Sequence, residues 1–181
     1  MGTAKTEQSP VKLFFALTVS EAELFETIES RLALEFVAID WRSEPFPFDH
    51  TDHYEKEMGP NLQKKFLSVA SLMLMQELED VKIHTNRIEK LFLNDRGGRR
   101  MNLDPGYLSL CKVVLATTKD YDHRIYVGSG IFEEVTLTYK KDRGFQPWPW
   151  TYPDYRTAET LAAFNALREK YREQLKNPVM P

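Results

Sequence analysis

Histidines and carboxylates are concentrated in one short segment, Asp49 to Glu57, which holds two of the four histidines and four acidic residues. His50 and His53 are three residues apart, a spacing at which one helical turn or a tight loop points both imidazoles at the same place. Together with Asp49 and Glu57 they would form a mixed nitrogen–oxygen ligand set, of the kind that binds zinc, manganese or ferrous iron. The segment is therefore a candidate metal site.

Two other interpretations of this segment remain open. A divalent ion would acidify a bound water and supply a nucleophile near neutral pH, but His50 and Asp52 could also act without metal as acid/base groups. Alternatively, the Asp and Thr side chains simply cap a short helix or turn in a proline-bounded loop. The cofactor is thus unassigned, with a divalent metal ion as the candidate.

A second candidate site is the segment Asn102 to Tyr107. Asp104 followed by proline predicts a helix N-terminus, whose free backbone amides bind anions, and Gly106 would let a phosphate or carboxylate approach the backbone closely. Asp104 itself is an acid/base candidate. The same residue types also form ordinary turns. The chain has neither a P-loop nor a GxGxxG motif.

Basic residues gather in a third segment, Thr117 to Arg124. Lys119 and Arg124 would bind an anionic group, Arg124 through two parallel hydrogen bonds. His123 is a further acid/base candidate beside them. A solvated connection is the alternative interpretation.

Three aromatic residues, Trp148, Trp150 and Tyr152, alternate along a proline-rich segment. In an extended chain their period of two places them on one side. Such a row would stack on a planar ligand or an unpaired base, with Trp148 and Trp150 as binding residues, or it would cover the protein's own core. Cys111 has apolar neighbours and is predicted to lie in the core.

The composition describes a soluble globular protein of 181 residues, 42% hydrophobic and 28% charged. A formal net charge of −3 argues against nucleic acid or an anionic membrane as partner. One cysteine excludes an internal disulfide, and the absence of a secretory or membrane-spanning apolar run favours the cytoplasm. The composition leaves the oligomeric state undetermined.

Hydrophobic periodicity predicts an α+β fold: a ferredoxin-like βαββαβ core, extended by a β-hairpin and a C-terminal helix. Residues 1–10 are predicted to be a disordered tail and residues 11–177 a single domain. A helix is favoured over a strand for residues 107–115. The other predicted strands are 11–19, 37–39, 65–72, 99–103, 124–127 and 131–139, and the helices are 24–36, 73–92 and 157–175.

Three strings resemble a bacterial and archaeal family catalogued as domain of unknown function 4416: FPFDHTDHYEKEMG, RRMNLDPGYLSLCKVVLATTKDYDHRIYVGSGIFEEVTL and FQPWPWTYPDYR. The resemblance extends from about Val11 to Tyr171. It implies a cytoplasmic, single-domain prokaryotic protein, and some members carry a label as GTP-binding proteins.

The motifs together predict an enzyme that acts on a small anionic or nucleotide-like metabolite. The test of this hypothesis is whether the motif segments meet in one cleft. A noncatalytic module that binds nucleotides or small ligands is the alternative.

Overall fold

The computed structural model describes residues 2–3, 9–49 and 54–180. Strands within these residues form one antiparallel sheet of nine strands in the order β2-β4-β1-β5-β6-β8-β7, with β3 paired to β4 and β9 to β8. The strands are β1 (Val11–Val19), β2 (Ile39–Arg42), β3 (Phe46–Pro47), β4 (Gln63–Met73), β5 (Met101–Leu108), β6 (Lys112–Thr117), β7 (Ile125–Gly128), β8 (Ile131–Lys140) and β9 (Gly144–Pro147). The predicted α+β class is confirmed.

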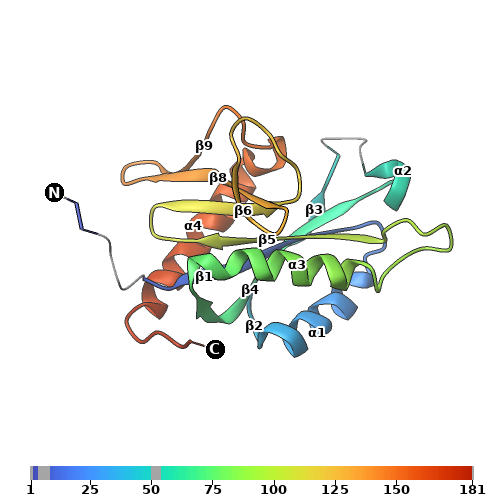
Figure 1. The fold of residues 1–181 in the computed structure, drawn as a ribbon, viewed down its shortest axis with the longest axis horizontal. Helices are drawn as coiled ribbons and strands as arrows, with labels where there is room; N and C mark the ends of the chain where they lie inside the picture. Colours follow the sequence, from blue (N-terminus) through green and yellow to red (C-terminus); the bar gives the residue numbers. More distant parts are fainter. Residues whose placement is uncertain (1, 4–8, 50–53, 181) are drawn as a thin grey trace.

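Helices pack on both faces of this sheet (Figure 1). Helices α1 (Leu24–Phe36) and α3 (Leu78–Glu89) cover one face, and α4 (Ala158–Gln174) covers the other. A short helix, α2 (Glu55–Met58), lies near the end of β3. None of the helices in the described part of the chain is long and apolar enough to cross a membrane.

Strand β1 lies in the middle of the sheet and is buried on both faces over its whole length. Phe15 and Leu17 pack in the core under α1 and α3, whereas Phe14 and Ala16 pack in the core under α4. A strand between two cores needs apolar residues on both sides, so it reads as a continuous apolar run. This is why the sequence predicts β1 with the bounds that the structure has.

The predicted helix at 107–115 is wrong: these residues form the end of β5, a short turn and most of β6. Tyr107 and Val114 pack in the core under α1 and α3, while Leu108 and Val113 pack in the core under α4. Because both faces are buried, the apolar run has no period that separates strand from helix. The predicted anion site at a helix N-terminus is therefore wrong as well.

Cys111 is exposed in the β5–β6 turn rather than buried in the core. The turn is held by Ser109, whose Oγ accepts a hydrogen bond from the backbone N–H of Lys112 at 3.2 Å. The turn was not predicted because short apolar runs lie on both sides of it in the sequence.

Gly106 lies inside β5 because another residue would not fit there. A Cβ at this position would stand 2.4 Å from the carbonyl oxygen of Val114 and 2.5 Å from Cζ of Phe14. The residue is thus required by the close approach of β6 and of the Phe14 ring, and not by a bound anion.

Most of the remaining elements follow the prediction with shifted ends, whereas β3, β9 and α2 were not predicted. The hairpin of β7 and β8 and the C-terminal helix α4 are present. Strand β4 continues to Met73 and a 3₁₀ turn at Met75–Glu77 precedes α3, so this helix is shorter than predicted.

Candidate functional site

A cleft of about 640 Å³ opens where β5 and β6 separate. The two strands pair only from Leu108↔Val113 to Gly106↔Leu115, and the first half of β5 has no partner on that side. The lining residues come from α3, β4, β5, β6 and β8 and from the segments before α2, between α3 and β5, between β6 and β7, and after β9: Phe48, Tyr54, Lys64, Lys82, Asn86, Glu89, Lys90, Leu93, Gly97, Arg99, Asn102, Asp104, Leu115, Ala116, Thr117, Thr118, Lys119, Arg124, Glu134, Tyr152, Asp154 and Tyr155.

Two charged side chains of helix α3 extend into the gap between β5 and β6. Nζ of Lys82 donates to Oδ1 of Asp104 at 2.8 Å, and Oε1 of Glu89 accepts from the backbone N–H of Leu103 at 2.7 Å. Asn102 adds a hydrogen bond from Nδ2 to Oδ2 of Asp104 at 2.7 Å. These side chains form hydrogen bonds with polar groups of β5 where the partner strand is absent. Buried polar groups need such partners.

Pro105 fits the same open edge. The N–H of Leu103 points away from β1, toward Glu89. In a strand, the backbone nitrogens of alternate residues point in the same direction, so the nitrogen of Pro105 also points away from β1. Pairing with β6 begins at the next residue, Gly106. The proline thus stands where no backbone donor is needed.

The environment shifts the two carboxyl groups in opposite directions. Burial favours the neutral form of Asp104, but Lys82 and the Asn102 amide outweigh burial and lower the pKa of this carboxyl. Burial raises the pKa of Glu89, although Lys82 and the Leu103 N–H act against it. One cleft thus contains a carboxylate that is held ionised and a carboxyl group that retains its proton more strongly. Their pKa values are moved apart, as the roles of base and acid require.

Arg99 connects this pair to α2. Its Nε and Nη2 each donate to one oxygen of Glu57 at 2.9 Å, and its Nη1 donates to Oδ1 of Asn102 at 2.9 Å and to Oε2 of Glu89 at 3.3 Å. The hydrogen bond to Glu57 raises the pKa of Arg99 above its ordinary value; burial acts against this rise, and the charge of Glu89 adds to it. Metal coordination by Glu57 would compete with this two-point ion pair.

A second ion pair, Lys64 with Asp154, is buried at the inner end of the cleft. Nζ of Lys64 lies 2.5 Å from Oδ2 of Asp154 and 4.7 and 5.1 Å from the ring centres of Tyr155 and Phe48. Both charged side chains are less than one-tenth exposed. Aromatic rings and the carboxylate together compensate for the lost hydration of the ammonium group.

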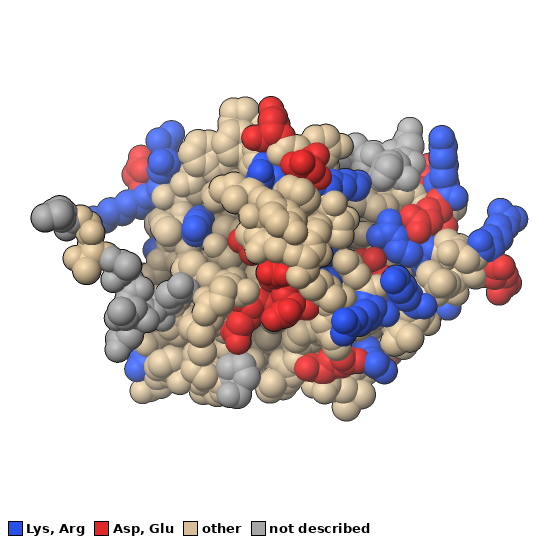
Figure 2. Space-filling view, in the orientation of Figure 1, with Lys and Arg blue, Asp and Glu red and all other residues tan. Residues whose placement is uncertain are grey.

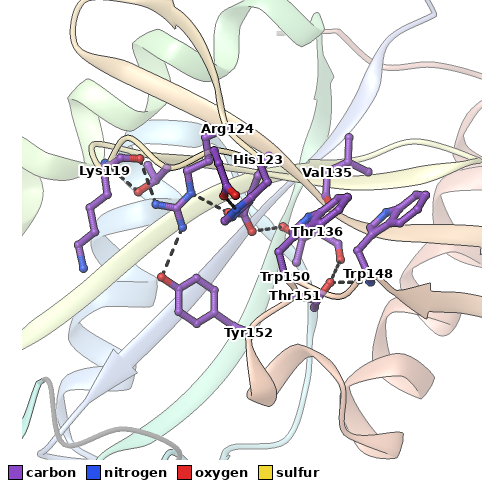
Figure 3. A network of polar contacts seen from close by, with 12 residues as sticks. Lys119, His123, Arg124, Val135, Thr136, Trp148, Trp150, Thr151 and Tyr152 are labelled. Carbon is purple, nitrogen blue, oxygen red and sulfur yellow. Dashed lines mark hydrogen bonds and ion pairs between the residues drawn. The ribbon is translucent and has the colours of Figure 1, made fainter.

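Arg124 forms the third buried ion pair, with Glu134 of β8 (Figure 3). Its Nε lies 2.8 Å from Oε2 of Glu134, its Nη1 donates to the carbonyl of Lys119 at 3.0 Å, and its Nη2 donates to Tyr152 at 3.4 Å. Figure 3 shows the ammonium end of Lys119 extending away from this network. His123 lies beside it, with Nε2 3.1 Å from the same oxygen of Glu134.

Four rings stack next to this network: Tyr121, His123, Trp150 and Trp148, with centre distances of 6.1, 5.7 and 5.2 Å in that order. The stack closes a gap in the edge of β8 between β7 and β9. There, Nε1 of Trp150 donates to the carbonyl of Val135 at 3.1 Å, and the neighbouring Thr151 hydroxyl donates to the carbonyl of Thr136 at 2.5 Å. These contacts support the interpretation that the aromatic segment covers the protein itself.

The predicted site residues fall into three groups. Asp104, Lys119 and Arg124 line the cleft together. His123 and Trp150 line a separate open hollow, with Trp148 stacked behind Trp150.

The predicted metal cluster forms the third group. Asp49 is exposed, Glu57 binds Arg99, and His50, Asp52 and His53 lie outside the described residues. The residues that bracket them, Phe48 and Tyr54, both line the cleft. Within residues 9–49 and 54–180 no three His, Cys, Asp or Glu side chains are placed to hold a metal ion, so the predicted metal set stays a prediction.

The cleft carries an excess of positive charge on an acidic chain. Six Lys or Arg residues line it against four Asp or Glu, whereas the whole chain has 24 basic and 27 acidic residues. Lys90 and Lys119 are exposed and form no ion pair within the part of the chain that the structure describes. Figure 2 shows basic side chains gathered on the right of this face, beyond the C-terminal end of α3.

Asn102 belongs to the second candidate segment, but several other cleft residues were not predicted: Lys64, Lys82, Glu89, Arg99, Glu134, Asp154 and Tyr155. One sequence signal for them exists in α3. Lys82 and Glu89 belong to the buried side of that helix, with Leu78, Thr85 and Ile88, and a charged residue in an apolar stripe indicates a buried partner. The other residues carry no such local signal.

A family model described as "Domain of unknown function (DUF4416)" matches residues 9–171. No curated protein matches the chain, and no solved structure matches it.

Proposed function

Because the chain belongs to the family described as domain of unknown function 4416, a description that names no activity, we propose its function from the cleft: it binds a small anionic metabolite and acts on it by proton transfer. The observation that carries the proposal is the charge of the lining. Six basic side chains against four acidic ones make a positive site on a negative protein. Such a site concentrates anions.

Two exposed lysines of the cleft lining, Lys90 and Lys119, have no ion-pair partner among the described residues. Lys90 follows the last turn of α3, and Lys119 follows β6, so the two ammonium groups come from different parts of the cleft lining. Both are exposed, unlike Lys64 and Lys82. A phosphate or carboxylate held between Lys90 and Lys119 would leave the rest of the ligand to fill the cleft, whose volume suits a molecule of metabolite size.

The proton-transfer part of the proposal rests on Asp104 and Glu89. Asp104 is held ionised by Lys82 and Asn102 and would act as the base. Glu89, whose pKa is raised by burial, would return a proton as the acid. The histidines of the 49–57 segment remain candidates for assisting them, since the flanking Phe48 and Tyr54 line the cleft.

Calorimetric titration with inorganic phosphate tests the binding step. We expect the double substitution Lys90→Ala/Lys119→Ala to weaken phosphate binding at least tenfold, because it removes the two ammonium groups proposed to hold the anion. The matched control is Lys141→Ala, an exposed lysine in the β8–β9 turn. Equal affinities in the double variant and the control would refute the proposed anion site.

Mass spectrometry after incubation with a pool of phosphorylated and carboxylated metabolites tests the catalytic step. We expect one compound to be consumed by the wild type and to be bound but not consumed by Glu89→Gln. Binding without turnover in the wild type would instead establish a noncatalytic module. The three preformed ion pairs, which hold the walls of the cleft in place, favour this second candidate function.

A further inference from the structure

The hydroxyl of Tyr155 is a buried donor without a hydrogen-bond partner in the described residues. Tyr155 is only 2% exposed and lines the cleft. Two other buried side-chain atoms share this property, Nε1 of Trp148 and Oγ1 of Thr160, but neither residue lines the cleft. Buried polar groups in proteins are nearly always bonded, so the Tyr155 hydroxyl marks a place where the cleft lacks a partner group.

Tyr155 lies next to the Lys64–Asp154 pair of the cleft lining, with its ring centre 4.7 Å from Nζ of Lys64. Burial, followed by the carboxylates of Asp154, Asp104 and Glu134, raises the pKa of Tyr155. All three carboxylates line the cleft. The phenol is therefore protonated at neutral pH and can donate a hydrogen bond.

The charges at this inner wall are balanced. Each of the three carboxylates is paired with its own cation: Asp154 with Lys64 at 2.5 Å, Asp104 with Lys82 at 2.8 Å, and Glu134 with Arg124 at 2.8 Å. An anion placed here would face three carboxylates, and a cation would face three ammonium or guanidinium groups. The wall suits a neutral group that both accepts and donates hydrogen bonds, which describes an alcohol hydroxyl.

We infer that the inner end of the cleft binds hydroxyl groups of the ligand through Tyr155, so that the ligand of the proposed site is a phosphorylated sugar or polyol. The inference rests on the proposed function, which places the anionic group at Lys90 and Lys119. Two lysines at the opening suit a doubly charged phosphate monoester, because an ammonium group binds phosphate as a compact point charge. The neutral, hydroxylated body of the same molecule then reaches the balanced inner wall.

Calorimetry with two probes of equal phosphate charge tests the inference. Ribose 5-phosphate carries hydroxyl groups on its body, whereas phenyl phosphate carries none. We expect the wild type to bind ribose 5-phosphate at least tenfold more tightly. Tyr155→Phe should lose about tenfold in affinity for ribose 5-phosphate and should keep the affinity for phenyl phosphate, because only the hydroxyl contact is removed.

The matched control is Tyr171→Phe, which removes another buried tyrosine hydroxyl, one that donates to the carbonyl of Pro10 and does not line the cleft. This variant should bind both probes as the wild type does. Equal affinity of the wild type for the two probes, or an unchanged ribose 5-phosphate affinity in Tyr155→Phe, would overturn the hydroxyl subsite while leaving the anion site intact. Absence of binding to both probes and to inorganic phosphate would overturn the proposed function as well.

Discussion

Glu89 of α3 takes the place of a missing strand partner for Leu103 of β5. Its carboxyl oxygen accepts the backbone N–H at 2.7 Å, at a point where β6 has already turned away from β5. The contact lets the sheet open without leaving a buried donor unbonded. It also brings a titratable group into the cleft, so the structural role and the proposed acid role belong to one side chain.

The raised pKa of Glu89 predicts a specific dependence of stability on pH. The unfolded chain loses this proton near the ordinary value of 4.5, whereas the folded protein loses it at higher pH. Wild-type stability therefore decreases as the pH rises through this interval. Glu89→Gln keeps an acceptor for Leu103 and does not titrate. We expect the difference in melting temperature, variant minus wild type, to increase between pH 4 and pH 8; a constant difference would contradict the raised pKa.

The Lys82–Asp104 pair predicts a rescue by a second substitution. Asp104→Ala leaves the ammonium of Lys82, only 6% exposed, without its partner. We expect a loss of about 3 kcal/mol in unfolding free energy by urea titration at pH 7, the lower end of the usual range because the Asp104 side chain is 32% exposed.

The double variant Lys82→Met/Asp104→Leu should recover most of this loss, because it removes both charges. The lowered pKa of Asp104 adds a second expectation. Its stabilising contribution is present above the ordinary value of 3.8 and disappears as the pH falls through the lower folded value. The deficit of Asp104→Ala should therefore shrink in strong acid. A double variant less stable than Asp104→Ala would contradict this account.

Two buried threonines near the aromatic segment should respond oppositely to the same substitution. Oγ1 of Thr151 donates to the carbonyl of Thr136 at 2.5 Å and accepts from the N–H of Trp148 at 2.8 Å. Thr151→Val should lower the unfolding free energy by about 1–3 kcal/mol, because two buried backbone groups lose their partner.

Oγ1 of Thr160 is equally buried but has no partner in the described residues. Thr160→Val should therefore leave the unfolding free energy unchanged or raise it. Chemical denaturation of the two variants side by side provides the comparison. Equal destabilisation would show that the Thr151 contacts do not hold the β8 edge.

The histidine segment supplies the last prediction, which comes from the sequence. His50→Ala/His53→Ala should abolish ligand binding or turnover with little change in melting temperature. Elemental analysis of protein purified without chelator separates the two active interpretations: a stoichiometric divalent ion, lost in the double variant, supports metal assistance. A large drop in melting temperature would instead support the purely structural interpretation of the segment.

The sequence alone determined those elements whose pattern is local. The apolar run of β1, the turn glycines between β7 and β8, and the helical spacing in α4 each predict an element that the structure contains. The resemblance of three segments to one family, from about Val11 to Tyr171, was also sufficient to predict the family match, which covers residues 9–171. These features depend on residues that are close together in the chain, so the spacing of those residues is sufficient to predict them.

Only the tertiary structure decided how residues 101–117 fold and what lines the cleft. Their apolar run is buried on both faces, so strand and helix leave the same pattern, and pairing with β1 and β8 selects the strands. Lys82 and Asp104 are 22 residues apart, and Lys64 and Asp154 are 90 residues apart. Their contacts exist because the sheet brings β4, β5 and the segment after β9 together, which no local spacing specifies.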